Sequence, residues 1–420
     1  MRTTFVVNVV IQPLQYPTMI GFEEIRKLAQ VTPSKILLLV MDGVGGLPHP
    51  ETGKTELETA NTPNLDRLAS ASICGMTYTV SPGITPGSAP GHMSLFGYDP
   101  LHYQFGRGIV EALGLDIEVG PGDVVARGNF CTVDERGIIT DRRAGRISTD
   151  VCKNLCDILN GEVSVPGIET TFVAGKEHRF VVKLRGNSLS EKVSDTDPQH
   201  EGMAPLDPKP VDPTARRTAD VAAEIVAQAR EVLKDQHPAN MFVLRGFSEH
   251  PDYPSIHDVY RLTPACIATY PMYRGVSRVV GMDILPAGET LEDELASLKR
   301  YYDSYDYFFM HYKKTDGRGE DGDFDAKVKA IEDYDRWLPS ILELNPDVVI
   351  VTGDHSTPAG LAGHSWHTIP VILSAKYCRH DEVAEFSEKA CLKGGLGVFP
   401  AVELMPLAMA NALKLNKFGA

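Results

Sequence analysis

Residues 35–43, Lys-Ile-Leu-Leu-Leu-Val-Met-Asp-Gly, carry the pattern that decides the fold. The run from Ile36 to Met41 is apolar without interruption, which is typical of a strand buried on both faces of a sheet. Three later stretches look alike, and they cover residues 305–310, 347–352 and 369–373. Helical patterns separate these strands. Buried strands that alternate with helices predict an α/β fold whose mostly parallel sheet is covered by helices on both faces.

The middle of the chain has a different pattern from its two ends. Its strands are shorter and more alternating, its turns are rich in Gly, Pro and Asp, and an Ala-rich amphipathic helix is predicted over 214–234. We therefore predict an inserted α+β domain at residues 116–265. The core domain then comprises 34–115 and 266–420, with helices predicted at 62–72, 291–302, 325–344 and 402–413. Residues 1–33 are predicted to be an N-terminal extension, with one strand and one helix at 21–30.

Composition limits the class of protein and its partners. The 420 residues are 43% hydrophobic and 23% charged, which is typical of a soluble globular protein. A net charge of −15 argues against nucleic acid or an anionic membrane as the partner. No stretch approaches the roughly 18–20 apolar residues of a membrane span. The seven cysteines include no C-x-x-C pair, which suits a reducing compartment, so we expect a cytoplasmic protein and leave a homo-oligomer open.

Acidic and histidine side chains follow or precede each predicted core strand. Asp42 follows the first strand, Asp316 the second and Asp354-His355 the third, while His364 precedes the fourth. In open α/β sheets ligands bind beyond the carboxyl ends of the strands, so these side chains are expected at one edge. Carboxylates alone would repel one another there, and a divalent cation is the natural counter-charge. Each motif alone is weak, but the set is more specific.

Ser88 is the candidate nucleophile, in the stretch Thr85-Pro-Gly-Ser-Ala-Pro-Gly-His92. The free N–H groups of a helix start favour anions, so a serine there can be loaded with phosphate. Its hydroxyl needs a base or a metal to become reactive near neutral pH. The G-x-S-x-G motif of α/β-hydrolases is absent, which favours metal activation. The alternative is that Ser88 only caps the helix.

Arginines crowd one stretch of this acidic chain, which suits a small, multiply charged anion: Arg107, Arg127, Arg136, Arg142, Arg143, Arg146, Arg179 and Arg185. The alternative for any one of them is ordinary solvated surface.

Several motifs in a fixed order resemble the alkaline phosphatase superfamily and, within it, the cofactor-independent phosphoglycerate mutases of archaeal type. They include Val40-Met-Asp-Gly-Val44, Leu95-Phe-Gly-Tyr-Asp-Pro100, Asp195-Thr-Asp-Pro198, Tyr270-Pro-Met-Tyr-Arg-Gly275 and Thr352-Gly-Asp-His-Ser-Thr357. The resemblance covers most of the chain, from Lys35 to about Leu413. It implies a core domain with two divalent metal ions. It also implies an inserted domain that holds glycerate through arginines.

The resemblance implies a role for each matching residue. One metal would be held by Asp42, Ser88, Asp354 and His355, and the other by Asp316, the residue at position 320 and His364. Substrate contacts would come from Arg127, Arg142, Arg143, Arg146, Arg245, Arg274 and Lys313. The family usually carries Asp-x-x-x-His at the second metal, where this chain has Asp316-Gly-Arg-Gly-Glu320. A carboxylate at position 320 favours Mg²⁺ or Mn²⁺ over Zn²⁺. His311 or His367 are alternative sources of the missing imidazole.

The activity that the resemblance implies is an isomerisation. Ser88 would take the phosphoryl group of 3-phosphoglycerate and return it to the 2-hydroxyl of glycerate. No 2,3-bisphosphoglycerate would be needed, and the reaction would serve glycolysis or gluconeogenesis. One alternative is a phosphatase or mutase that acts on another small phosphate or phosphonate. The other is a catalytically impaired relative retained for binding, with Glu320 as the altered ligand.

Overall fold

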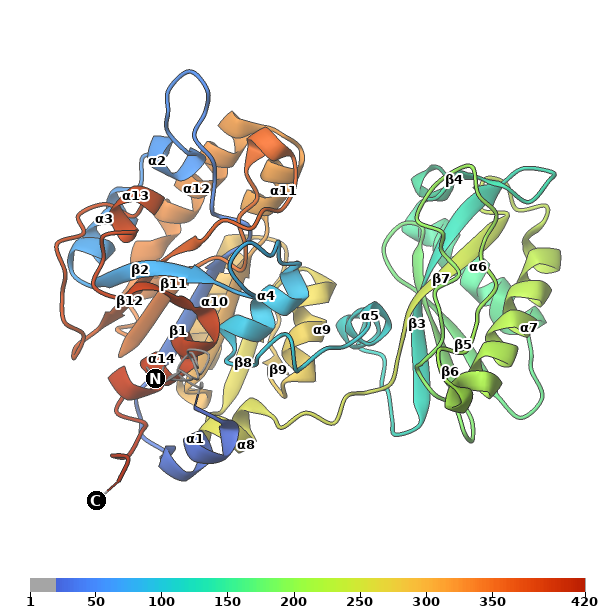
Figure 1. The fold of residues 1–420 in the computed structure, drawn as a ribbon, viewed down its shortest axis with the longest axis horizontal. Coiled ribbons are helices and arrows are strands. Elements are labelled where there is room, and N and C mark those ends of the chain that lie inside the picture. Colours follow the sequence, from blue (N-terminus) through green and yellow to red (C-terminus); the bar gives the residue numbers. More distant parts are fainter. Residues whose placement is uncertain (1–19, 420) are drawn as a thin grey trace, which may run out of the picture.

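The computed structural model describes residues 20–419, which form two lobes (Figure 1). The larger lobe contains a sheet of eight strands in the order β13-β2-β12-β11-β1-β10-β8-β9. The strands are β1 Ile36–Met41, β2 Ile73–Tyr78, β8 Pro264–Ile267, β9 Asp283–Ile284, β10 Tyr307–Tyr312, β11 Val348–Thr352, β12 Ile369–Ala375 and β13 Gly397–Pro400. All four strands predicted from apolar runs are confirmed.

The sheet is mostly parallel, and β12 is the strand that departs from this. It runs antiparallel to both β11 and β2, whereas β11, β1, β10 and β8 run parallel to one another. Because β12 is reversed, the residues before it lie at the edge where β1, β10 and β11 end. His364 therefore lies at the same edge as residues that follow the other strands.

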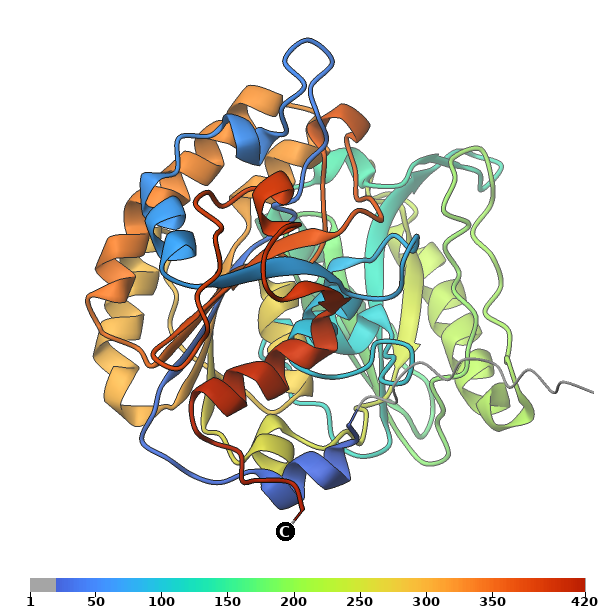
Figure 2. The same ribbon diagram turned by 60° about the vertical axis from the view of Figure 1, so that its left-hand side comes forward.

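Helices cover both faces of this sheet (Figures 1 and 2). Alternate residues of β1 belong to two separate cores: Ile36, Leu38 and Val40 to one, and Leu37, Leu39 and Met41 to the other. The first core includes α1 Phe22–Leu28, α4 Ser88–Leu95, α5 Arg107–Gly114, α8 Ile256–Tyr260, α9 Pro271–Val279 and α14 Leu404–Asn411. The second includes α2 Glu56–Thr59, α3 Pro63–Ser70, α10 Leu291–Tyr301, α12 Phe324–Leu342 and α13 Glu388–Cys391. Continuous apolar strands thus follow from burial on both sides.

The smaller lobe is built on a five-stranded antiparallel sheet. Its strands are β3 Asp123–Val133, β4 Ile139–Asp141, β5 Glu169–Ala174, β6 Arg179–Arg185 and β7 Met241–Ser248. Residues of α6 Thr149–Glu162 and α7 Arg216–Leu233 share a hydrophobic core with this sheet. Helix α8, which lies within residues 116–265, instead packs in the core of the larger lobe with α1. The strand expected in the N-terminal extension falls outside the described residues. The helix expected at 21–30 is confirmed as α1.

Helix α5 lies between the two lobes (Figure 1) and contacts both. Two glycines let it approach α9 closely: a Cβ on Gly275 would fall 2.0 Å from the carbonyl oxygen of Val110, and one on Gly114 would fall 2.2 Å from that of Pro271. On its other side, a Cβ on Gly108 would fall 2.5 Å from the Val125 carbonyl oxygen of β3. These close contacts fix the smaller lobe beside the edge of the large sheet. Within the described residues, no helix combines the length and apolar character needed to span a membrane.

Candidate active site

The predicted side chains meet at one edge of the large sheet. Asp42 follows β1, Asp354 and His355 follow β11, and Asp316 lies on α11 (Lys314–Glu320), directly after β10. All four side chains are inaccessible to solvent, whereas His364 is partly exposed. The convergence follows from the rule for carboxyl ends of parallel strands, with His364 brought in by the reversal of β12.

The first group of candidate ligands is Asp42, Asp354 and His355. The Nε2 atom of His355 lies 3.3 Å from Asp42 Oδ1 and 3.2 Å from Asp354 Oδ2. The same nitrogen lies 3.1 Å from Ser88 Oγ, at the first residue of α4. The N-cap of this helix is Gly87 and not Ser88, and the Ser88 hydroxyl faces the cluster.

The second group is Asp316, His355 and His364. His364 Nε2 lies 3.5 Å from Asp316 Oδ1, and the His364 ring stacks on His355 with centroids 3.6 Å apart. Thr357 Oγ1 bridges two members of this group, since it donates to Asp316 Oδ1 at 2.6 Å and lies 2.9 Å from His355 Nδ1. His355 is the residue that the two groups share. Glu320 Oε1 lies 3.7 Å from His364 Nε2, but its side chain is 54% exposed and falls outside the compact group.

The donor set fits divalent cations. Asp42 Oδ1 and Asp354 Oδ2 are buried and have no hydrogen-bond donor among the described residues. Burial and the nearby Asp42 raise the pKa of Asp354. Burial opposes ionisation of Asp42, yet His311 and Lys313 hold its pKa well below the ordinary value. Burial lowers the pKa of His355, which keeps the imidazole neutral, as a metal ligand must be.

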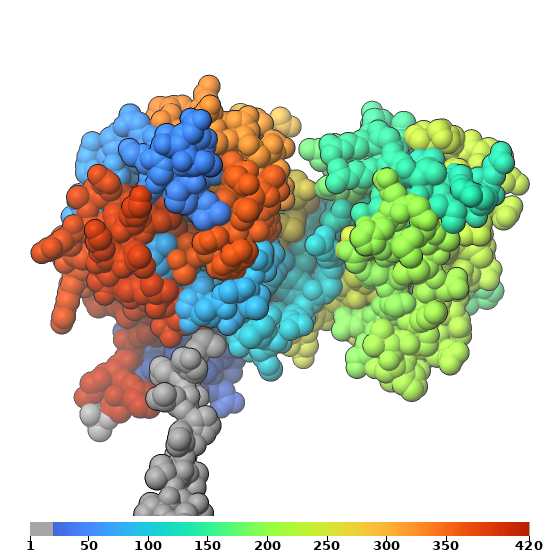
Figure 3. Space-filling model, turned by 45° about the horizontal axis from the view of Figure 1, so that its top comes forward, coloured from blue at the N-terminus to red at the C-terminus, as the bar shows by residue number. Residues whose placement is uncertain are grey.

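A cavity of about 420 Å³ lies between this edge and the smaller lobe, and Figure 3 shows the hollow between the lobes. Its lining includes Arg127, Arg142, Arg143, Arg146, Arg179, Arg245, Tyr270 and Glu320. Arg142 Nη2 donates to Asp197 at 2.7 Å, which anchors that side chain. The cavity is therefore strongly cationic on the side of the smaller lobe. Glu320 lines the cavity and lies 3.7 Å from His364, so it connects the cavity with the second group of candidate ligands.

Two predicted substrate contacts have other partners in the structure. Arg274 Nη2 lies 2.8 Å from Asp116 Oδ2, and Arg274 does not line the arginine cavity. Lys313 Nζ lies 3.1 Å from Asp42 Oδ2 and also pairs with Asp316. Lys313 is thus bound to the carboxylate cluster itself, whereas Arg274 fastens α9 to the loop after α5.

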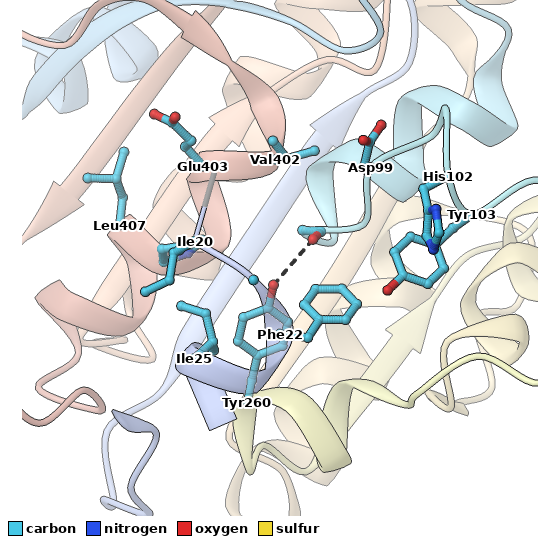
Figure 4. Close-up of a pocket in the computed structure, with 13 residues that line it drawn as sticks. Ile20, Phe22, Ile25, Asp99, His102, Tyr103, Tyr260, Val402, Glu403 and Leu407 are labelled. Atoms are coloured by element: carbon cyan, nitrogen blue, oxygen red, sulfur yellow. Dashed lines mark hydrogen bonds between the residues drawn. The ribbon is translucent and has the colours of Figure 1, made fainter. Parts of the chain in front are cut away.

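A larger cavity of about 540 Å³ lies far from this chemistry, between α1, α8 and α14 (Figure 4). Its walls include the rings of Phe22, Tyr103 and Tyr260, and the Tyr260 hydroxyl donates to the Gly97 carbonyl at 3.4 Å. It contains none of the predicted site residues.

Comparisons with known proteins agree with this arrangement. The family model described as 2,3-bisphosphoglycerate-independent phosphoglycerate mutase matches residues 69–240. A protein from Thermosipho africanus, named probable 2,3-bisphosphoglycerate-independent phosphoglycerate mutase, is 51% identical over 397 residues, which are 94% of this chain and 98% of that protein. A Thermus thermophilus protein of the same name is 50% identical and covers 95% of this chain and 99% of its own length. The chain belongs to this mutase family.

Solved structures show the same fold as this family member. The PH0037 protein from Pyrococcus horikoshii is 28% identical, with a TM-score of 0.80 over 93% of this chain and 100% of its own. A cofactor-independent phosphoglycerate mutase from Thermoplasma acidophilum is 30% identical, with a TM-score of 0.69 over 90% of this chain and 100% of its own.

Sequence reasoning missed several residues that support the site of this family member. Lys327 is fully buried on α12 and donates to the carbonyl oxygens of Gly43, Gly45 and Thr357 at 2.8–3.0 Å. It therefore ties the loop after β1 to the loop after β11. Its signal in the sequence is a lysine on the apolar stripe that Ala330, Ile331 and Tyr334 continue. Tyr273 and His92, both inaccessible to solvent, also pack behind the ligands. His311, an alternative ligand from the sequence, packs with them; it lies 3.2 Å from Asp42 Oδ2 and belongs to neither ligand group.

Proposed function

We propose that this protein is a 2,3-bisphosphoglycerate-independent phosphoglycerate mutase of archaeal type, an isomerase that interconverts 3-phosphoglycerate and 2-phosphoglycerate. The observation that carries the proposal is the position of Ser88. Its hydroxyl lies against His355, a member of both ligand groups. The arginine cavity beside these groups suits a phosphorylated carboxylic acid, because paired arginines bind carboxylates and phosphates well.

Two divalent cations are proposed at the sheet edge, with Mn²⁺ or Mg²⁺ preferred over Zn²⁺. The first would be held by Asp42, Ser88, Asp354 and His355, and the second by Asp316, Glu320 and His364. When bound, the cations would supply the positive charge that lowers the pKa of the Ser88 hydroxyl and stabilises the phosphoryl oxygens. The carboxylate at position 320 supports the harder ions, because Mg²⁺ and Mn²⁺ favour oxygen ligands.

The residues of the chain then carry out two transfers. Ser88 Oγ forms a bond to phosphorus, the bond from phosphorus to the 3-oxygen breaks, and the proton that Ser88 loses balances the one that the 3-hydroxyl gains. The arginine cavity keeps the glycerate while it reorients. Its 2-hydroxyl attacks the phosphoserine, which restores Ser88 and releases 2-phosphoglycerate. Because the phosphoryl group stays on the enzyme, no 2,3-bisphosphoglycerate is needed. We propose a cytoplasmic location for this activity.

Phosphorus NMR of 3-phosphoglycerate, with and without a chelator, tests the proposal. The protein should produce 2-phosphoglycerate, and the chelator should stop it. Ser88→Ala should abolish turnover without loss of fold, whereas Ser94→Ala, a buried serine on the same helix, should remain active. Release of inorganic phosphate in place of the isomer would favour a phosphatase. Metal-loaded protein without any turnover would favour a relative retained for binding.

A further inference from the structure

The two carboxylate oxygens of Asp42 have different surroundings. Three groups converge on Oδ2: the Tyr273 hydroxyl donates to it, His311 Nε2 lies 3.2 Å away and Lys313 Nζ lies 3.1 Å away. Within residues 20–419, Oδ1 has no hydrogen-bond donor, and it lies 3.3 Å from His355 Nε2, the nitrogen that also faces Ser88. One oxygen is therefore engaged by the protein, and the other is left for a cation.

Tyr273 is held more firmly than Lys313. Its side chain is inaccessible to solvent, and its ring stacks on His311 with centroids 3.5 Å apart and an angle of 24°. It lies in the first turn of α9, where Pro271 favours the start of the helix. The contact of Gly275 with Val110 fixes this helix against α5. Lys313, by contrast, is 30% exposed and shares its ammonium group with Asp316.

We propose that Tyr273 is a positioning residue of the metal site, whose hydrogen bond to Oδ2 makes Asp42 bind the cation through Oδ1 alone. The proposal rests on the proposed function, because it takes Asp42 as a metal ligand. A carboxylate can bind a cation through one oxygen or both, and a donor held on one oxygen favours the single-oxygen mode. The orientation of Asp42 then sets where the cation lies relative to Ser88.

The same logic applies to Asp354 on the opposite side of the group. Its Oδ1 accepts a hydrogen bond from the Gly43 backbone N–H at 3.1 Å, and its Oδ2 has no hydrogen-bond donor in the part of the chain that the structure describes. Both aspartates thus present one free oxygen toward His355. At Asp42, however, the restraint comes from a side chain on α9, outside the loops that carry the candidate ligands. A substitution can therefore remove it without altering the backbone of the ligand loops.

Tyr273→Phe is the test, because it removes the hydroxyl and retains the ring. Tyr307→Phe is the matched control: Tyr307 is also inaccessible to solvent, and its hydroxyl has no hydrogen-bond partner among the described residues. Both variants and the unaltered protein are stripped of metal and titrated with Co²⁺. Affinity is measured by competition with a chelator, and the visible absorption of the bound Co²⁺ is recorded.

Tyr273→Phe should weaken one Co²⁺ site by roughly 10–100-fold, the usual effect of removing a group that orients a ligand. Its visible absorption should also fall, because binding through both oxygens of Asp42 raises the coordination number. Tyr307→Phe should leave the Co²⁺ affinity and the visible absorption unchanged. Equal affinity and an equal spectrum for Tyr273→Phe and the unaltered protein would overturn the proposal. Circular dichroism of the metal-free variant checks that the fold is retained.

The proposed function and the proposed role of Tyr273 can be rejected independently of each other. An unaltered protein that binds Co²⁺ but never isomerises 3-phosphoglycerate would reject the mutase and leave the role of Tyr273 intact. An unaltered protein that binds no Co²⁺ would reject both.

Discussion

Single side chains at this site differ in how firmly their surroundings hold them. Asp42, Asp354 and His355 are inaccessible to solvent, whereas Glu320 is half-exposed at the end of α11. Burial and the nearby Asp316 raise the pKa of Glu320, with Lys313 and His364 opposing the shift. A carboxyl group in this position gains from a bound cation, which would offset the repulsion from Asp316.

Glu320→His tests whether position 320 contributes a metal ligand. The variant should keep isomerase activity and shift the preferred metal from Mg²⁺ or Mn²⁺ toward Zn²⁺, because a neutral nitrogen replaces a charged oxygen. Activity is measured after reconstitution of the metal-free protein with each ion in turn. Asp321→His, at the exposed neighbouring residue, is the control and should leave the metal preference unaltered. An unchanged preference in Glu320→His would show that residue 320 is no ligand.

At the scale of elements, α10 contains a buried acid that the reaction does not use. Glu294 is 4% exposed and lies beside Tyr312 of β10 and Tyr334 of α12. Burial raises the pKa of Glu294 to about 8, although Lys314 opposes the shift. The folded protein therefore holds a proton on this side chain at neutral pH, whereas the unfolded chain does not.

Glu294→Gln should stabilise the protein in a pH-dependent manner. The folded pKa is above the unfolded value, so the stability of the unaltered protein falls relative to the variant as pH rises between about 4.5 and 8. The difference in free energy of unfolding between Glu294→Gln and the unaltered protein should be small at pH 4.5 and about 3 kcal/mol near pH 7. Urea unfolding of metal-free protein at several pH values measures it. Glu292→Gln, at an exposed residue on the same helix, should show no such trend, and a pH-independent difference for Glu294→Gln would contradict the assignment.

At the scale of the whole molecule, the proposed chemistry is divided between two lobes. The proposed nucleophile and the metal-ligand groups belong to the larger lobe. The arginines of the cavity come from the smaller lobe, and Tyr270 and Glu320 line the same cavity from the larger lobe. Helix α5, packed against α9 on one side and β3 on the other, sets the distance between the two halves. In the proposed mechanism, retention of glycerate would depend on the smaller lobe and phosphoryl transfer on the larger one.

Arg127→Met should separate these two roles. Loss of one charged contact to glycerate should lower kcat/KM by about 30-fold, which corresponds to about 2 kcal/mol. More glycerate should escape before the second transfer, so the share of inorganic phosphate among the products should rise. Phosphorus NMR reports both products. Arg136→Met, at an exposed arginine paired with Asp134, is the control; an unchanged product ratio in Arg127→Met would place glycerate elsewhere.

The sequence by itself determined the elements and the main candidates for the site. Strands buried on both faces must be apolar throughout, so residues such as Ile36 to Met41 reveal them without a structure. Parallel strands end at one edge, so Asp42, Asp354 and His355 could be placed together from their order alone. These features depend on local pattern and on one general rule of chain topology.

Only the tertiary structure decided which groups surround those side chains. Lys327 lies 284 residues from Gly43, and Tyr273 lies 231 residues from Asp42, yet each pair is joined by a hydrogen bond. The reversal of β12 and the pairing of Arg274 with Asp116 were equally hidden. Such contacts depend on how helices pack over the sheet, and a buried polar group takes whichever partner that packing brings within reach.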